Sequence, residues 1–100
     1  MRVSLHPDAD AELSAAAVYY AKNAGKPVAE RFLAEFDRAV ELLRERPGLG
    51  IPWHAGTRKL PMRKFPYNVV YYERHGGVRI LAIAHQRRLP GYWRDRVQPA

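Results

Sequence analysis

The stretch Lys59–Trp93, KLPMRKFPYNVVYYERHGGVRILAIAHQRRLPGYW, determines how this chain folds. It holds two runs rich in Val, Ile and Tyr, Tyr67–Arg74 and Val78–Gln86, on either side of Gly76-Gly77. Such runs indicate β-strands, and a glycine pair adopts the positive φ angles that a two-residue turn requires. The stretch therefore predicts an antiparallel β-hairpin.

A two-residue turn at the glycine pair also predicts the register of this hairpin. In that register Asn68 lies opposite His85, on one face of the two strands. Arg87 follows His85 by two residues and shares this face. We expect the functional site at this end of the hairpin, far from the turn.

Two helices are predicted before the hairpin. Pro7 is typical of a first helical turn, and apolar residues spaced three and four apart continue from there to about Gly25. A second apolar stripe runs through Phe32 and Phe36 and stops at Pro47. The few residues around Gly25 join the two helices into an antiparallel helical hairpin.

The remaining segments complete the predicted order of elements. Arg2–His6 alternates apolar and polar residues as a strand does, Gly48–Gly56 is predicted to be a loop, and Thr57–Phe65 a strand. The order strand, helix, helix and three strands, with a short helical turn after Pro90, predicts an α+β fold. In it the helical hairpin packs on a small, mostly antiparallel sheet. We expect one domain spanning residues 1–100, because there are no linkers or repeats.

Composition excludes several classes of site. The chain has no cysteine, which excludes disulfides and thiolate metal sites, and its four histidines show no metal-ligand spacing. We expect neither a metal nor a cofactor. No run approaches the roughly 20 apolar residues of a membrane span, and the first residues lack the apolar run of a signal peptide. A cytoplasmic protein without membrane contact is expected.

The positive charge is concentrated in the second half of the chain. Residues 1–56 contain seven Lys and Arg against eight Asp and Glu, whereas residues 57–100 contain ten against two. A field of this sign favours nucleic acid, a phosphorylated surface or an acidic protein as the partner.

Cationic, amide and aromatic side chains near the end of the hairpin are the predicted binding residues. Arginine binds phosphate oxygens with two parallel hydrogen bonds, and aromatic rings stack on unpaired bases. The alternative is a basic surface that keeps the protein in solution and docks an acidic partner. The residues predicted to bind a target or a protein partner are Lys59, Arg63, Lys64, Asn68, Arg87, Arg88, Tyr92 and Trp93.

Three residues are candidates for catalysis of RNA cleavage. This reaction needs a base, an acid and neutralisation of the phosphate, and His85 with Arg87 and Arg88 could supply these roles. The alternative is that His85 caps the end of the sheet by hydrogen bonding.

Four segments together resemble the RelE/ParE superfamily of toxins from type II toxin-antitoxin modules. They are VSLHPDADAEL, the Phe32–Leu43 helix that ends in Pro47-Gly48, RKLPMRKFPYNVVYYE and ILAIAHQRRLPGYW. The resemblance implies a small growth-inhibiting toxin that is neutralised by an adjacently encoded antitoxin, whose extended tail wraps it. It also implies one of two targets. RelE-like members cleave mRNA on the ribosome, whereas ParE-like members poison DNA gyrase without a known enzymatic step.

Individual positions favour the ParE-like branch. Arg87 matches a basic position of the RelE-like ribonucleases, and Tyr92 or Trp93 falls near their C-terminal aromatic residue. However, Asn68 stands where those ribonucleases commonly carry an arginine, and Pro61 where they often have a lysine. The resemblance therefore implies a gyrase inhibitor. An mRNA endoribonuclease is the first alternative, and an inactive or purely regulatory component is the second.

Overall fold

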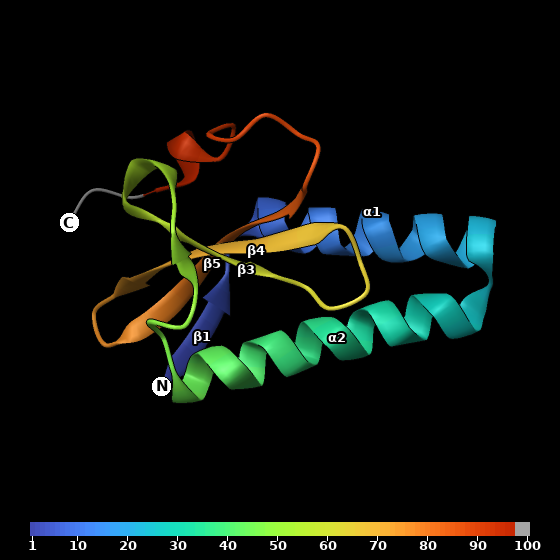
Figure 1. Cartoon of the computed structure of the whole chain (residues 1–100), viewed down its shortest axis with the longest axis horizontal. Coiled ribbons are helices and arrows are strands. Elements are labelled where there is room, and N and C mark those ends of the chain that lie inside the picture. The colour runs from blue at the N-terminus through green and yellow to red at the C-terminus, as the bar shows by residue number, and fades with distance from the viewer. Residues whose placement is uncertain (98–100) are drawn as a thin grey trace.

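A computed structural model describes residues 1–97 as two helices packed on a five-stranded sheet. The elements are β1 (Arg2–Leu5), α1 (Pro7–Ala24), α2 (Lys26–Glu45), β2 (Ile51–Pro52), β3 (Arg58–Pro61), β4 (Tyr67–Arg74) and β5 (Gly77–His85), with 3-10 turns η1 (His54–Gly56) and η2 (Arg94–Arg96). The strand order is β1-β5-β4-β3-β2, and only the β1–β5 pair is parallel. The predicted α+β fold, with its helical hairpin and mostly antiparallel sheet, is confirmed (Figure 1).

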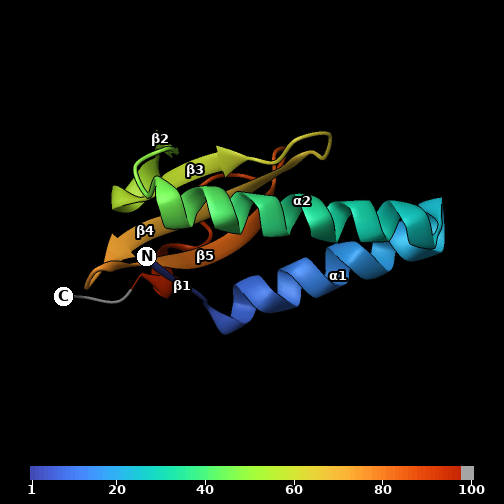
Figure 2. The ribbon, with the colours of Figure 1, turned by 90° about the horizontal axis from the view of Figure 1, so that it is seen from below.

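The helical hairpin forms where the sequence predicts it. His6 caps α1 by accepting a hydrogen bond from the Asp8 amide at its Nδ1, and Pro7 follows in the first turn. Gly25, with a φ of 95°, separates the two helices and lets the chain reverse. Figure 2 shows the two helices side by side along the sheet, with their joined end projecting beyond the strands.

The main core lies between the helices and the sheet. Small residues on α1, such as Ala9 and Ala16, let this helix approach β5 closely. Phe32 of α2 is fully buried, and its ring centroid lies 5.5 Å from that of Tyr67 on β4. The periodic apolar positions of the sequence therefore face this core, as predicted.

The turn of the β4–β5 hairpin differs from the prediction by one residue. Its two central residues are His75 and Gly76, whose φ angles are 50° and 74°, and Arg74 pairs with Gly77. Gly77 instead begins β5, where a Cβ atom would lie 2.9 Å from the carbonyl oxygen of Arg2 on β1. One glycine therefore makes the turn, and the other permits close approach of the neighbouring strand.

A β-bulge shifts the register a second time. Val70 pairs with Ala82, whereas Tyr71 pairs with Ile80, so Leu81 is an extra residue in β5. Leu81 and Ala82 consequently both pack on the face that is turned away from the helices.

Together these shifts overturn the predicted pairing of Asn68 with His85. Asn68 lies opposite Ala84, on the face away from the helices, whereas His85 lies opposite Tyr67, on the helix face. The two side chains therefore lie on opposite faces of the hairpin.

The chain after β5 folds back over the face opposite the helices and forms a second core (Figure 1). Trp93 is its central residue and is 1% exposed. It packs with Val70, Leu81, Ala82 and Ala84. The middle of the β4–β5 hairpin is therefore covered on both faces.

The strands before the hairpin are shorter than predicted. β3 ends at Pro61 instead of Phe65, because residues 62–66 form a turn in which Lys64 has a φ of 66°. β2, which falls in the predicted loop, consists of only two residues that pair with Lys59 and Arg58.

Tyr71 fixes the loop after α2 to the sheet. Its hydroxyl group donates a hydrogen bond to the Pro47 carbonyl (2.7 Å) and accepts one from the Gly50 amide (2.8 Å). A Cβ atom at Gly50 would lie 2.6 Å from this hydroxyl oxygen, so glycine is required here. The Tyr71 side chain is fully buried.

We expect Tyr71→Phe to lower the free energy of unfolding by about 1 to 3 kcal/mol, because it leaves the Gly50 amide and the Pro47 carbonyl without a partner. Urea denaturation of the purified variants measures this. Tyr72→Phe is the matched control, because the buried Tyr72 hydroxyl has no hydrogen-bond partner among residues 1–97. Its stability should change by less than about 0.5 kcal/mol. Equal losses in the two variants would contradict the assigned role of Tyr71.

Candidate functional site

A hollow of about 380 Å³ lies on the face of the sheet opposite the helices, between β3, β4 and the chain that follows β5. We call it the β3–β5 hollow. Five of the predicted site residues line it, namely Lys59, Asn68, His85, Arg88 and Trp93. His85 lines it from the last position of β5, although its ring packs against Tyr67 on the helix face. The structure thus gathers part of the predicted set at one place.

Positive charge borders this hollow, whereas its floor is largely apolar. Val70 and Ala84 contribute to the floor. The Lys59 amino group lies 3.5 Å from the centroid of the Trp53 ring, in a cation–π contact that holds the lysine at the rim. No Asp or Glu is among the described residues that line the hollow. Its electrostatics therefore favour an anionic or polar ligand group.

Two of the predicted residues are buried in its floor. Asn68 is 9% exposed and Trp93 is 1% exposed. The expectation that Trp93 offers a free face for stacking is wrong for this conformation, because the second core needs the indole ring. Its Nε1 atom is buried without a hydrogen-bond partner among residues 1–97.

A backbone amide and a neighbouring aromatic ring fix the orientation of the His85 side chain. Its Nδ1 atom accepts a hydrogen bond from the Arg87 amide (3.1 Å), and its ring lies edge-on to Tyr67 at 5.2 Å between centroids. With Nδ1 as an acceptor, the neutral imidazole carries its proton on Nε2. This is the capping arrangement that the sequence offered as the alternative to catalysis.

The other predicted cations do not line this hollow. Arg63 and Lys64 lie exposed in the β3–β4 turn, and Lys64 borders a separate hollow beside α2. Arg87 is exposed after β5. The β3–β4 turn and the chain that follows β5 are neighbours, because the Gln86 amide donates to the Pro66 carbonyl (2.9 Å).

Glu12 of α1, which sequence reasoning missed, organises the adjoining part of the site. Its Oε1 atom accepts hydrogen bonds from the Ile83 amide (3.0 Å) and from Arg96 (3.0 Å). Its Oε2 atom accepts hydrogen bonds from the Tyr92 hydroxyl (2.9 Å) and from Arg96 (3.2 Å). One carboxylate therefore joins α1, β5 and the C-terminal segment.

The need for this carboxylate follows from the length of β1. β1 ends at Leu5, whereas β5 continues to His85, so no strand within residues 1–97 neighbours the edge of β5 beyond Ile80. Glu12 satisfies the Ile83 amide there, and Arg96 donates to the Leu81 carbonyl (2.9 Å). Side chains thus replace the missing strand.

Tyr92 and Arg88 pack onto this network. The Arg88 guanidinium carbon lies 3.6 Å from the centroid of the Tyr92 ring, and its Nη1 atom lies 3.9 Å from Glu12. Burial, followed by the hydrogen bond to Glu12, raises the pKa of Tyr92 to about 12. Tyr92 therefore remains a neutral hydrogen-bond donor at physiological pH.

The sequence contains a signal for Glu12. Buried Ala9 and Ala16 lie three residues before and four residues after it on α1. An acidic residue at this spacing lies on the inward-facing stripe, where a carboxylate needs partners.

Comparison with known proteins identifies the family. The sequence model of the family described as "ParE toxin of type II toxin-antitoxin system, parDE" matches residues 3–90. The chain belongs to this ParE toxin family. A solved structure titled "Chromosomal ParDE TA system from P. aeruginosa" is similar with a TM-score of 0.77 and 23% sequence identity, over 85% of this chain and 95% of that chain. It shows that the fold is shared.

The resemblance to the RelE/ParE superfamily is thereby confirmed. A search of curated proteins gave no match. In the described part of this ParE-family chain, no three His, Asp or Glu side chains are grouped to hold a metal ion. None of its described helices is long and apolar enough to span a bilayer.

We expect Glu12→Gln to lower the free energy of unfolding by about 2 kcal/mol, because it removes the charge that pairs with Arg96 in a largely buried setting. Urea denaturation measures the loss. Glu41→Gln is the matched control, because Glu41 also pairs with an arginine, Arg44, but is 69% exposed. Its effect should stay below about 0.5 kcal/mol. A similar effect of both substitutions would refute the structural role of Glu12.

Proposed function

We propose that this ParE-family protein is a toxin that inhibits growth by poisoning DNA gyrase, and that an acidic antitoxin encoded beside it neutralises it in the cytoplasm. The match of the ParE toxin family to residues 3–90 is the observation that supports this most directly. The excess positive charge of residues 57–100 supports an acidic partner and a target that binds DNA.

The geometry around His85 favours recognition over catalysis. RNA cleavage needs an acid and a base, but the Nδ1 atom of His85 is engaged by the Arg87 amide. The nearby carboxylate of Glu12 accepts hydrogen bonds from three partners. Both of its oxygens are therefore occupied by hydrogen bonds that hold the structure together.

The surface that we assign to the target comprises the β3–β5 hollow and the exposed cations beside it. Lys59 and Arg88 border the hollow, and Arg87 lies exposed next to Arg88 in the chain. Arg63 and Lys64 extend the positive surface along the neighbouring turn. Binding through such a surface requires charge and shape but no proton transfer.

The groove between α1 and β5 is the surface that we assign to the antitoxin. It has a volume of about 300 Å³, and Ala15, Tyr19, Tyr67 and Ile83 are among the residues that line it. Tyr19 is 59% exposed, which leaves a large apolar ring without cover on this surface. An extended acidic tail could bury this ring and pair with Arg88 at the end of the groove.

We expect His85→Gln to retain growth inhibition and Arg87→Ala to lose most of it, because glutamine preserves hydrogen bonding whereas alanine removes an exposed charge. Induced expression and a gyrase supercoiling assay with purified protein measure the two effects. Arg87→Ala should alter stability by less than about 0.5 kcal/mol, as is usual for a surface position. In a translation extract, ribosome-bound mRNA should remain intact.

The RelE-like alternative gives the opposite result. If His85 is a general acid or base, His85→Gln slows mRNA cleavage by roughly 10² to 10⁴. Codon-level cleavage that His85→Gln abolishes would replace gyrase poisoning by endoribonuclease activity. A protein that neither inhibits growth nor affects gyrase or mRNA would be an inactive or regulatory component.

We expect co-expression with the adjacent reading frame to yield a complex with a small acidic protein. Tyr19→Glu should weaken this complex, because it places a negative charge in the groove opposite an acidic tail. Leu33→Glu is the matched control, since Leu33 is an exposed apolar residue of α2 that does not line the groove. Calorimetric titration of each variant with the antitoxin measures the two affinities. Equal weakening would rule out this groove as the main contact.

A further inference from the structure

The Asn68 amide in the floor of the β3–β5 hollow is a buried polar group without a partner in the described part of the chain. The residue is 9% exposed, and its side chain makes no hydrogen bond with any residue from 1 to 97. Unlike the Trp93 Nε1 atom, the amide is not sealed off from the surface, because Asn68 lines the hollow. Buried polar groups are normally paired, so this amide indicates a ligand.

Strand pairing explains why the amide has no partner. The residues opposite Asn68 in the sheet are Pro61 of β3 and Ala84 of β5, and neither has a polar side chain. Val70, two residues further along β4, is apolar and shares the same face. The floor of the hollow is therefore an apolar surface that carries one amide.

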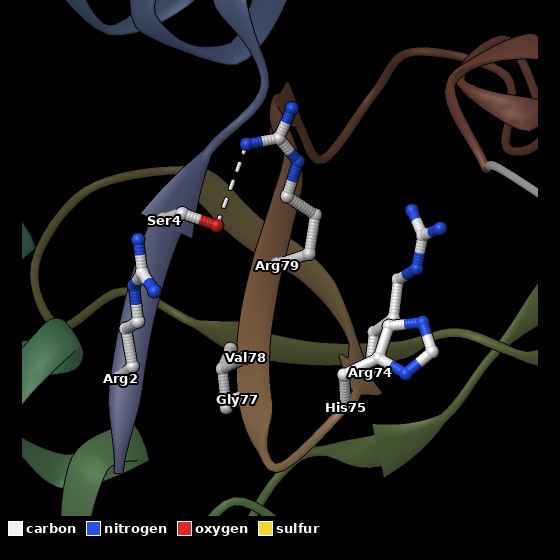
Figure 3. A pocket seen from close by; sticks show the side chains of 7 residues that line it. All are labelled: Arg2, Ser4, Arg74, His75, Gly77, Val78 and Arg79. Atoms are coloured by element: carbon white, nitrogen blue, oxygen red, sulfur yellow. Dashed lines mark hydrogen bonds between the residues drawn. The ribbon is translucent and has the colours of Figure 1, made fainter.

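A second hollow on this face of the sheet, near the β4–β5 turn, differs in this respect. It has a volume of about 310 Å³, and Arg2, Ser4 and Arg79 are among the side chains that line it (Figure 3). The Arg79 Nη1 atom donates to the Ser4 hydroxyl (3.4 Å) and to the Leu5 carbonyl (3.1 Å). Arg79 is thus bound by its own neighbours, whereas the Asn68 side chain has no such contact within residues 1–97.

Lys59 supplies a positive charge beside the Asn68 amide. It pairs with Val70 and therefore lies on the same face as Asn68, about 7 Å further along the strands. Its amino group contacts the Trp53 ring, which carries no charge, and no Asp or Glu is among the described lining residues. The hollow thus combines an apolar floor, an amide that both donates and accepts hydrogen bonds, and a cation at the rim.

We propose that the β3–β5 hollow binds an unpaired nucleotide of a DNA strand, with its base against the floor and its phosphate near Lys59. A base has apolar faces and an edge on which a donor lies beside an acceptor, so it pairs with both halves of an amide. Asparagine forms two such hydrogen bonds with adenine. The inference rests on the proposed function, which assigns this hollow to a target that acts on DNA, and it names the chemical group that the hollow takes.

An acidic side chain of a protein partner fits the hollow less well. A carboxylate only accepts hydrogen bonds, so it pairs with the amino half of the Asn68 amide and leaves the carbonyl half without a donor. It would also lose water against Val70 and Ala84, and one lysine at the rim offsets that cost only in part.

Two fluorescent single-stranded DNA oligonucleotides of equal length and charge test the proposal with the isolated full chain. One carries adenine at every position, and the other is abasic. We expect the adenine oligonucleotide to bind about tenfold more tightly, because only its bases enter the hollow. Asn68→Leu should lower this ratio of affinities by about fivefold or more, because leucine has a similar size but no hydrogen-bonding group. Asn23→Leu is the matched control, since Asn23 is the other asparagine of the chain and lies exposed on α1, and it should leave the ratio unchanged.

A second measurement needs no variant and decides the question if Asn68→Leu does not fold. The ¹⁵N-labelled full chain is titrated with adenosine monophosphate and, separately, with ribose 5-phosphate, which lacks the base. We expect saturable shifts of the Asn68 side-chain amide resonances with the nucleotide alone. Equal shifts with both ligands, or no shifts at Asn68, would overturn the proposal.

The oligonucleotides give further outcomes that would overturn it. These are equal affinities for the adenine and abasic strands, a ratio that Asn68→Leu leaves unchanged, or base-dependent binding of the matching RNA but not of DNA. Displacement of the adenine strand from the hollow by a polyglutamate peptide, without any preference for bases, would assign the hollow to an acidic side chain instead. All these measurements are made without gyrase, so their failure is distinguishable from a failure of the growth and supercoiling assays.

Discussion

The carboxylate of Glu12 at the open edge of β5 is the interaction on which the C-terminal half of this protein depends. β1 covers only the first part of that edge, and beyond Ile80 the backbone groups of β5 need other partners. Glu12 and Arg96 supply them, and the same two side chains bring Tyr92 against α1. This contact holds the chain after β5 close to the sheet, so that Trp93 can close the second core and bound the β3–β5 hollow. A residue far from that hollow in sequence therefore shapes it.

The second core also explains why the sheet carries two separate hollows on one face. Trp93 covers Val70 and the bulged residues of β5, but the start of β5 has Gly77, which offers no side chain to pack against. Arginines of the neighbouring strands surround that part of the face. The β-bulge contributes as well, because it turns two consecutive apolar residues toward Trp93 and so concentrates the second core in the middle of the hairpin.

The elements were predictable from the sequence, whereas the register was not. Helical periodicity is a strong local signal that predicts both helices, and the Val- and Tyr-rich runs predict the hairpin. The turn was misplaced because Gly76 and Gly77 are equally suited to positive φ, and only the approach of β1 distinguishes them. The sequence pattern does not indicate the bulge, because Leu81 and its neighbours are apolar and the hairpin buries apolar residues on both faces. Lys59 and Arg88, both predicted from the sequence as binding residues, line one hollow, but the burial of Trp93 depends on a long-range contact that no local pattern encodes.

The excess positive charge of the C-terminal half is not one continuous patch. Several of its arginines serve the structure: Arg96 binds Glu12, Arg79 donates to Leu5, and Arg58 donates to the Gly50 carbonyl at 2.9 Å. Exposed cations remain in the turns beside the β3–β5 hollow, and Arg2 of β1 is exposed beside the β4–β5 turn. An acidic partner that covers only one of these regions leaves the other charged. An extended acidic chain that follows the sheet could neutralise both, because charges separated by more than about 10 Å are largely screened from one another at physiological salt and must be met locally.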